Sequence, residues 1–230
     1  MNTRERFNKI IKYFNETKPI AETELKYHNP YELIVAVILS AQCTDKRVNI
    51  ITPRFFANFP NVETLANAKI EEIFSFIKSC SYPNNKAKNL SGMAKMLVNK
   101  FHSKMPSDTE ELMQLPGVGR KTAHVLASVL YHKPVMAVDT HVFRVSARLG
   151  LTKNAKNPLD CEKQLTKYLK NDQIPIAHQW LILHGRYVCT ARNPKCDKCG
   201  LQEWCAFYQK QLSKTETGEK IEIQIFESKL

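Results

Sequence analysis

The sequence predicts an all-α fold, and three observations lead to that class. Apolar residues recur at spacings of three and four along several segments, as they do on one face of a helix. No segment before residue 209 alternates apolar and polar residues in the manner of a surface strand. Hydrophobic residues make up 43% of the 230 residues, which is enough for one large core or two smaller ones without disulfide support.

The first half of the chain contains three clear helical patterns. Residues 4–14 carry an apolar stripe formed by Phe7, Ile10, Ile11 and Phe14. Residues 31–42 are apolar on most faces, and their length favours a core helix over a buried strand. Residues 90–101 carry a third stripe, with lysines on the other faces: Leu90, Met93, Leu97 and Phe101.

The second half continues the same pattern. Ser107 and Glu110 fit a capping box for a short helix that ends near Leu115. A longer helix is expected from about Gly119 to Tyr131, because the residue before Pro134 disfavours helical geometry. Three further helices are expected at 140–149, 159–170 and 176–188.

The two ends of the chain carry weaker signals. The segment 209–230 is polar and is expected to form a flexible tail, although Ile221, Ile223 and Ile225 alternate as in a small strand. The amphipathic N-terminal segment lacks the apolar stretch of a signal peptide. No apolar run approaches the roughly 20 residues of a membrane span, so we expect a cytoplasmic protein without a membrane partner.

The net charge of +12 is concentrated in two stretches. Residues 73–107 contain six lysines and no acidic residue. Residues 140–159 also lack acids and carry four cations: Arg144, Arg148, Lys153 and Lys156. A field of one sign suits a polyanionic partner, although a solvated lysine-rich surface would have the same composition.

Residues 115–124, LPGVGRKTAH, predict a helix–hairpin–helix. Pro116 ends the first helix, since it has no backbone N–H to donate. Gly117 and Gly119, on either side of Val118, allow a tight turn and close backbone approach. The amides at the start of the next helix, followed by Arg120, would then form an anion site suited to a phosphate. A plain helix–helix turn without a ligand is the alternative.

Lys121 follows directly in the first turn of the second helix. The positive helix end and the adjacent Arg120 both disfavour its ammonium form. A neutral lysine amine is a nucleophile that forms Schiff bases with carbonyl-like carbons. From chemistry alone, a simple phosphate contact is the favoured alternative for this side chain.

Asp139 is the single acid in a basic region and precedes an amphipathic helix. Aspartate is a good N-cap, which accounts for the residue structurally. A carboxylate near bound phosphates could also deprotonate a nucleophile or stabilise positive charge developing on a sugar. The two roles are compatible.

Four of the seven cysteines form the pattern C-x6-C-x2-C-x5-C at Cys189, Cys196, Cys199 and Cys205. Four thiolates suit a structural zinc ion or an iron–sulfur cluster, and the spacing alone slightly favours zinc. The loop also carries three cations that could clamp phosphate: Arg192, Lys195 and Lys198. The three remaining cysteines are expected to pack as small buried thiols: Cys43, Cys80 and Cys161.

Together, LPGVGRKTA, AVDTHVFRV and WLILHGRYVC with its cysteine pattern resemble endonuclease III, a bifunctional DNA glycosylase and AP lyase of base excision repair. The resemblance covers residues 25–206. It implies two helical domains on either side of a DNA-binding cleft: a six-helix barrel over 24–133, and a cluster domain made of 1–23 and 134–208. It also implies a [4Fe–4S] cluster in place of zinc.

The resemblance assigns roles to individual residues. Lys121 matches the Schiff-base lysine and Asp139 the catalytic aspartate. Gln42, in ILSAQCTD, matches the residue that fills the gap left by an extruded nucleotide. Tyr82, in SYPNNKA, falls where the family often has a leucine wedge.

Two positions depart from the family pattern. Ser81 stands where many members have glycine, and His124 where many have asparagine. Neither change removes chemistry, but both leave the lesion preference open.

The resemblance implies removal of oxidised pyrimidines from duplex DNA by a monomer, nucleoid-associated if the source is bacterial. Damaged bases or abasic sites would be flipped into the cleft, attacked at C1′ and processed by β-elimination. A related adenine-mismatch glycosylase fits less well, since it typically lacks a lysine at position 121 and needs a glutamate where Val37 stands. A non-catalytic helix–hairpin–helix module is the alternative from another class.

Overall fold

The computed structural model describes residues 1–216, which form α-helices, short 3-10 helices and turns without a strand. The prediction of an all-α fold is confirmed for these residues. The chain divides into two compact units, one of residues 23–133 and one that joins Met1–Glu22 to the chain from Pro134 onward. Among the described residues, no helix is both long and apolar enough to cross a lipid bilayer.

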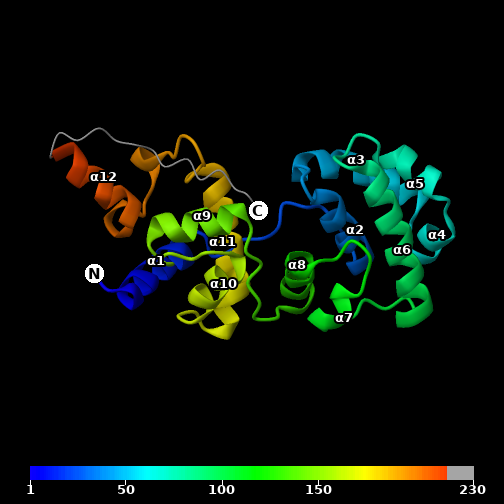
Figure 1. The fold of residues 1–230 in the computed structure, drawn as a ribbon, viewed down its shortest axis with the longest axis horizontal. Coiled ribbons are helices and arrows are strands. Elements are labelled where there is room, and N and C mark those ends of the chain that lie inside the picture. The colour runs from blue at the N-terminus through cyan, green and yellow to red at the C-terminus, as the bar shows by residue number, and fades with distance from the viewer. Residues whose placement is uncertain (217–230) are drawn as a thin grey trace. The chain divides into compact units, whose positions relative to one another are not determined.

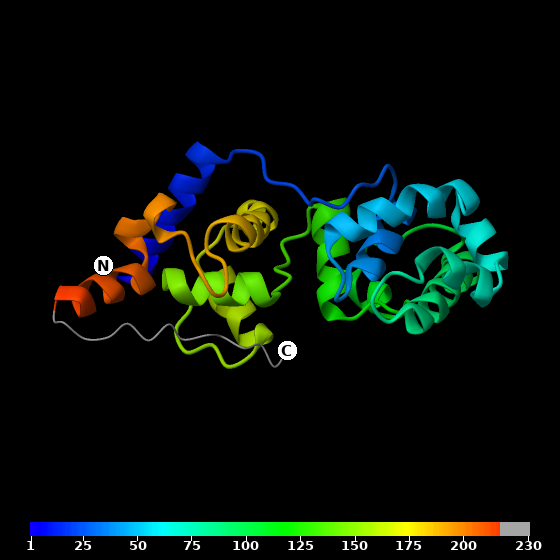
Figure 2. The same ribbon diagram turned by 90° about the horizontal axis from the view of Figure 1, so that it is seen from above.

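The unit of residues 23–133 is built around a buried helix, α2 (Pro30–Ser40). Seven consecutive residues of α2, from Leu33 to Leu39, are buried, and Asn29 caps its first turn. Figures 1 and 2 show the helices around it: α3 (Asp45–Asn58), α4 (Val62–Asn67), α5 (Ile70–Ile77), α6 (Pro83–Phe101), α7 (Thr109–Met113) and α8 (Arg120–Tyr131). Helix α2 packs against α3, α6 and α8, which confirms the expected core helix.

Three of these helices were not singled out from the sequence. Helix α3 contains Pro53, and α4 and α5 are too short to show a repeated apolar stripe. The expected cap of α7 was wrong by one residue. Asp108, not Ser107, is the N-cap, and its Oδ1 accepts hydrogen bonds from the amides of Glu110 at 2.9 Å and Glu111 at 3.2 Å.

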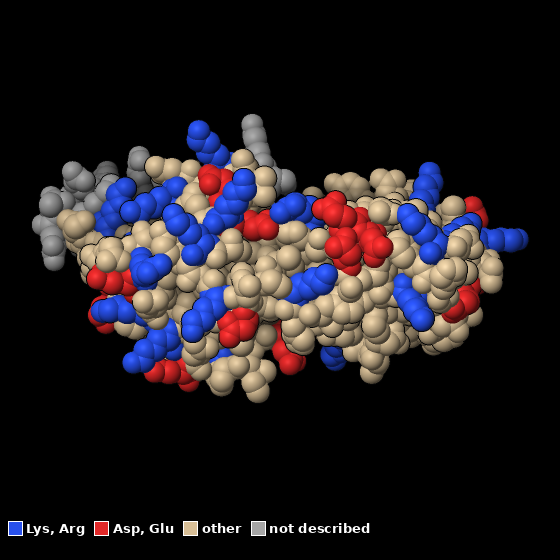
Figure 3. Space-filling model, turned by 90° about the horizontal axis from the view of Figure 1, so that it is seen from below, with Lys and Arg blue, Asp and Glu red and all other residues tan. Residues whose placement is uncertain are grey.

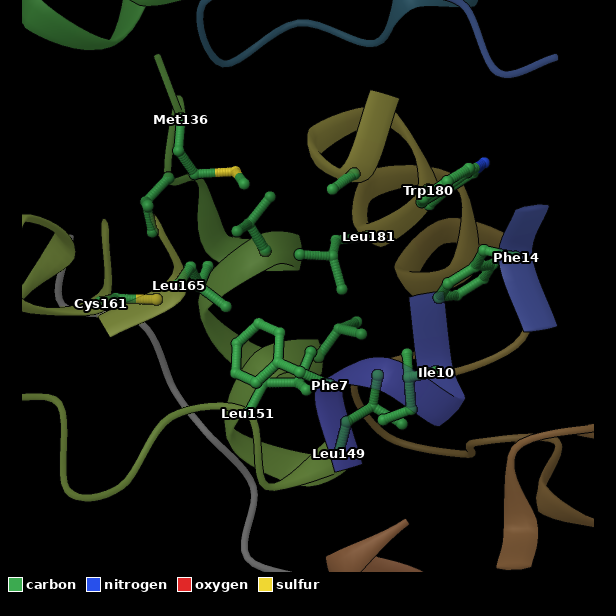
Figure 4. Close-up of a cluster of buried hydrophobic side chains, with 14 of the residues drawn as sticks. Phe7, Ile10, Phe14, Met136, Leu149, Leu151, Cys161, Leu165, Trp180 and Leu181 are labelled. Carbon is green, nitrogen blue, oxygen red and sulfur yellow. The ribbon is translucent and has the colours of Figure 1, made fainter. Parts of the chain in front are cut away.

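The other unit packs four helices around one apolar core. They are α1 (Thr3–Thr17), α9 (Thr140–Leu149), α10 (Pro158–Thr166) and α11 (Ile174–Tyr187). Figure 4 shows Phe7, Ile10 and Phe14 of α1 pointing into this core. Phe14 stacks on Trp180 of α11, with ring centroids 5.4 Å apart. The N-terminal helix therefore packs in the unit that contains the cysteine loop.

The cysteine loop contacts helix α1 through polar groups as well. Arg6 donates from Nε to the carbonyl of Trp204 at 3.0 Å, and Lys9 pairs with Glu203 at 3.6 Å. After Cys205 the chain forms α12 (Ala206–Glu216). The segment expected to form a flexible tail from residue 209 is helical as far as Glu216. The rest of that segment, including the isoleucine alternation, lies outside the described residues.

Candidate active site and metal centre

The predicted hairpin is present between α7 and α8 and rests on helix α6. Val118 is buried, and its amide donates to the carbonyl of Leu115 at 3.0 Å. The ring of Pro116 lies against Gly92 of α6, where an added Cβ would come within 3.1 Å of it. Gly117 has φ +83°, and a Cβ there would lie 2.9 Å from Asn89 of α6. The turn is thus fixed against α6 by close contacts that need small residues.

The second glycine of the hairpin has a different environment. Gly119 has an ordinary φ of −86° and would place a Cβ with no heavy atom within 4 Å. It is the N-cap of α8 and supplies no capping side chain. The first amides of a helix lie at the positive end of its dipole and favour an anion. The backbone here is therefore open for approach by a phosphate.

Lys121 lies in the first turn of α8 and is exposed, as is Arg120. The opposite side of α8 is buried through Ala123, His124 and Leu126. Lys121 is therefore directed away from the core of its unit, at the same helix end as Gly119. His124, one of the two departures from the family pattern, is only 5% exposed, and so its substitution falls on the core side of α8.

Asp139 is the N-cap of α9, and its Oδ1 accepts a hydrogen bond from the amide of Val142 at 2.8 Å. The carboxylate is half-buried. Burial lowers the pKa of His141 and of Arg144, and the charge of Asp139 acts against that lowering at both. The capping role is therefore present, and the catalytic role expected for Asp139 stays a prediction. Lys121 and Asp139 belong to different units.

The residues expected to probe DNA lie on two adjoining loops. Gln42 and Tyr82 both have left-handed backbone conformations, with φ of 54° and 53°, and both side chains are exposed. The Ser81 hydroxyl joins the loops by donating to the Gln42 carbonyl at 2.6 Å. Lys86 was not singled out from the sequence, yet it is buried and donates from Nζ to the carbonyls of Leu39 at 2.8 Å and Ala41 at 2.7 Å.

The four clustered cysteines line one pocket. Apolar side chains complete its wall, among them Leu149, Val188, Phe207 and Tyr208. The described residues contain no group of three or more His, Cys, Asp or Glu side chains that could hold a metal ion. A single zinc ion needs its ligands gathered about 2.3 Å from one point, whereas a four-iron cluster is held by thiolates spread around it. Thiols that surround a pocket fit the cluster better.

Two buried arginines of α9 hold the start of the cysteine loop. Arg144 donates from Nη2 to the Gly185 carbonyl at 2.9 Å and from Nε to the Cys189 carbonyl at 3.2 Å. Arg148 donates to the carbonyls of Thr190 and Ala191, both at 2.7 Å, and its Nη1 lies 3.5 Å from the Cys189 sulfur.

These arginines correct one interpretation of the charge pattern. Both were counted with the basic field expected to face a polyanion, but Arg144 is 7% and Arg148 3% exposed. Their positive charge acts inside the unit, next to thiols whose pKa burial raises, to about 11 for Cys205. Metal ligation requires thiolates, so buried guanidinium groups favour the ligating form. Sequence reasoning missed this role because spacing cannot tell a buried arginine from an exposed one.

The three other cations of the cysteine loop remain available to solvent. Arg192, Lys195 and Lys198 are exposed, as a phosphate clamp would require. The molecular face in Figure 3 carries Lys and Arg together with clusters of Asp and Glu. The charge on that face therefore has both signs and is not a uniform positive field.

Comparison with known proteins places these features in a family. Residues 35–171 match the model of the HhH-GPD superfamily of base excision DNA repair proteins. Residues 189–205 match the iron–sulfur binding domain of endonuclease III. The matched segment begins at Cys189 and ends at Cys205, the first and last of the four clustered cysteines.

Individual relatives agree with these matches. The endonuclease III of Rickettsia felis is 44% identical over 201 residues, which are 87% of this chain and 94% of that protein. A solved structure of a trapped endonuclease III–DNA covalent intermediate has a TM-score of 0.86 and 40% identity, covering 92% of this chain and all of that one. A non-covalent endonuclease III–DNA complex has a TM-score of 0.87 and 39% identity, covering 93% and 100%.

Replacing Arg148 with lysine is expected to weaken the iron–sulfur site. Lysine cannot reproduce the planar fork that binds the carbonyls of Thr190 and Ala191. Loss of such a support is expected to cost about 10–100-fold in metal affinity. Iron content and absorbance at about 400 nm would measure the loss. The exposed Arg192→Lys variant is the matched control, and equal iron retention in both variants would contradict the role of Arg148.

The two hairpin glycines are expected to respond differently to serine. Gly117→Ser should destabilise the protein by about 1–2 kcal/mol or more, because the left-handed conformation and the contact with Asn89 both disfavour a side chain. Gly119→Ser should leave stability within about 0.5 kcal/mol of the parent or raise it, since serine is a favoured N-cap. Thermal unfolding of the two variants compares them directly, and equal midpoints would contradict the assignment.

Proposed function

Since the chain belongs to the endonuclease III family of the HhH-GPD superfamily, a family of DNA glycosylases with AP lyase activity in base excision repair, we propose that Lys121 is its Schiff-base nucleophile and that oxidised pyrimidines are its substrates. The [4Fe–4S] cofactor expected from the sequence is confirmed by the iron–sulfur domain at 189–205. DNA is its partner, as the match to complexes with DNA supports.

The exposed position of Lys121 carries the proposal. Its amine lies in the first turn of α8, directly after an N-cap that leaves open space beside the backbone. A phosphate bound at the helix start would hold the neighbouring sugar near this turn. The trapped covalent complex of the related endonuclease III agrees with a nucleophile on the protein.

The chemistry begins with attack of the Lys121 nitrogen on C1′ of the flipped nucleotide. The glycosidic bond breaks, and its electron pair leaves with the damaged base. The C1′–O4′ bond then breaks as the nitrogen lone pair forms the C1′=N bond of the Schiff base, and O4′ takes up a proton as the sugar ring opens. The Schiff base acidifies C2′, and loss of a C2′ proton breaks the C3′–O bond and expels the 3′ phosphate, which nicks the strand. We assign to Asp139 the acceptance of the proton from the attacking lysine and the stabilisation of positive charge on the sugar.

The exposed loops supply the contacts that keep the nucleotide out of the duplex. Gln42 fills the vacated space, and Tyr82, 64% exposed, is the intercalating wedge. Both residues are held in left-handed conformations before DNA arrives. An aromatic wedge can stack on neighbouring bases as well as separate them, which distinguishes Tyr82 from the leucine frequent at this position.

Phosphates along the duplex would contact the exposed cations Arg120, Arg192, Lys195 and Lys198. These contacts position DNA without reading its sequence. We further propose that the protein acts as a monomer on damaged bases and abasic sites. Its place would be the cytoplasm, on the nucleoid if the source is bacterial.

The two rival functions have weaker support. An adenine-mismatch glycosylase would need an acid where Val37 stands, and Val37 is 7% exposed within the apolar helix α2. A non-catalytic hairpin module would not account for an exposed lysine at the position of the Schiff-base residue in a family of lyases.

Lys121→Ala is expected to abolish the covalent complex that borohydride traps between the enzyme and a duplex containing thymine glycol, because no amine remains to form the imine. Binding of the duplex should change little. Gel separation of trapped product measures the first quantity and fluorescence anisotropy the second. Arg120→Ala, which removes the adjacent cation, should still trap, and trapping by Lys121→Ala would refute the assignment.

Asp139→Asn should slow base release by about 10²–10⁴-fold, the usual contribution of a positioned acid–base group. Asparagine is as good an N-cap as aspartate, so the thermal midpoint should stay close to that of the parent. Single-turnover base release and thermal unfolding separate the two roles. Unchanged base release would reduce Asp139 to a helix cap.

A further inference from the structure

Two cysteines that do not belong to the metal centre meet behind the DNA-probing loops. Cys43 follows Gln42 directly, and Cys80 precedes Tyr82 by two residues. The Cys43 and Cys80 side chains lie close enough together for Cys43 to affect the ionisation of the Cys80 thiol. Two loops that are 37 positions apart in the sequence thus place their thiols together.

Local hydrogen bonds hold the backbone of both cysteines. The Cys43 amide donates to the Ser40 carbonyl at 3.0 Å, and the Cys80 amide donates to the Ile77 carbonyl at 2.8 Å. The hydrogen bond from Ser81 to Gln42 joins the residues next to them. The thiols therefore meet in a fixed arrangement and not by a chance approach of two mobile segments.

The pair differs from the other cysteines in accessibility and charge. Cys80 is 4% exposed, but Cys43 is half-buried and can be reached from solvent. Burial and the neighbouring Cys43 raise the pKa of Cys80 to about 11, and the positive charges of Lys86 and Arg47 oppose that rise. The remaining cysteine outside the metal centre, Cys161, is fully buried and contacts Ser146.

We propose that Cys43 and Cys80 are a modification site, a dithiol that low-molecular-weight disulfides of the glutathione type oxidise reversibly to an intramolecular disulfide. The Cys43 thiolate attacks one sulfur of the oxidant and releases one thiolate. The Cys80 thiolate then attacks the Cys43 sulfur of the mixed disulfide and releases the second. One oxidant disulfide is reduced to two thiols, and the protein loses two hydrogen atoms.

The bond would act on the residues that probe DNA, a consequence that rests on the proposed function. A disulfide holds its two Cβ atoms about 3.8 Å apart, so its formation requires the loops of Gln42 and Tyr82 to shift until the two cysteines reach that separation. Gln42 lies between Cys43 and the Ala41 carbonyl held by Lys86. Its backbone must therefore absorb the shift. The oxidised protein is expected to bind lesion DNA less well than the reduced protein.

The cross-link is tested on the full chain with its cluster in place. The protein is equilibrated with mixtures of oxidised and reduced glutathione, the remaining thiols are alkylated, and peptides are mapped by mass spectrometry without reduction. We expect a linked pair of peptides containing Cys43 and Cys80, which dithiothreitol separates. Absorbance at about 400 nm checks that the cluster is retained. Alkylation of both cysteines even in pure oxidised glutathione would overturn the proposal.

Variants separate the pair from other thiols. Cys80→Ser should stop the reaction at a mixed disulfide of Cys43 with glutathione, and Cys43→Ser should leave Cys80 reduced. Cys161→Ser removes a thiol outside the pair and should still form the link. Equal modification of Cys43 with glutathione in the parent and in Cys80→Ser would contradict an intramolecular bond.

The functional consequence is measured as affinity for a duplex with an abasic-site analogue. Oxidation should weaken binding by the parent and by Cys161→Ser by about tenfold, reversibly, because the probing loops lose their preorganised geometry. Binding by Cys43→Ser should not respond. Equal affinity before and after a verified cross-link would overturn this consequence. If the reduced protein failed to bind the abasic-site duplex, this result would count against the proposed function alone. The cross-link would still stand, because the peptide map that detects it does not depend on DNA.

Discussion

The buried guanidinium groups of Arg144 and Arg148 connect the metal centre to the helix that carries Asp139. They donate hydrogen bonds to the carbonyl oxygens of Gly185 in α11 and of Cys189, Thr190 and Ala191 in the cysteine loop, and to the Cys189 sulfur. Because both residues lie on α9, whose N-cap is Asp139, a displacement of the loop must move the same helix. The cluster can therefore be structural and still bear on the proposed catalytic role of Asp139, because the arginines that hold its loop lie on the helix that Asp139 caps.

Helix α6 has the same supporting role in the unit of residues 23–133. Lys86, Asn89 and Gly92 recur at a spacing of three and so share one face of the helix. Lys86 binds the carbonyls that lead into Gln42, while Asn89 and Gly92 contact the glycine and proline of the hairpin. One helix thus supports both the loop of Gln42, which we propose to probe the duplex, and the turn that precedes Lys121. Positions set on such an element are more precise than positions set by a loop alone.

The sequence predicted the features that depend on local chemistry and missed those that depend on tertiary contacts. The buried helix α2, the hairpin and the cysteine pattern all follow from residue types at fixed spacing. The different roles of Gly117 and Gly119 do not, because the left-handed conformation of Gly117 and its contact with Asn89 are visible only in the structure. The burial of Arg144, Arg148 and Lys86 was missed for the same reason. The sequence of a basic segment does not distinguish a cation that is exposed to DNA from one that binds a backbone carbonyl inside the protein.

The left-handed conformations of Gln42 and Tyr82 connect the local backbone contacts of these residues with their proposed role in DNA binding. A non-glycine residue in the left-handed region costs about 1–3 kcal/mol and persists only where its surroundings enforce it. Gln42 and Tyr82 are both in that region, and hydrogen bonds hold the backbone around them. The Ser81 hydroxyl donates to the Gln42 carbonyl, the Lys86 ammonium to the Ala41 carbonyl and the Lys86 amide to the Tyr82 carbonyl. Ordering these loops in advance avoids an entropic cost when the duplex binds. A covalent bond between Cys43 and Cys80 would add a constraint to the loops that these hydrogen bonds hold, whereas the face of α6 formed by Lys86, Asn89 and Gly92 would stay unchanged.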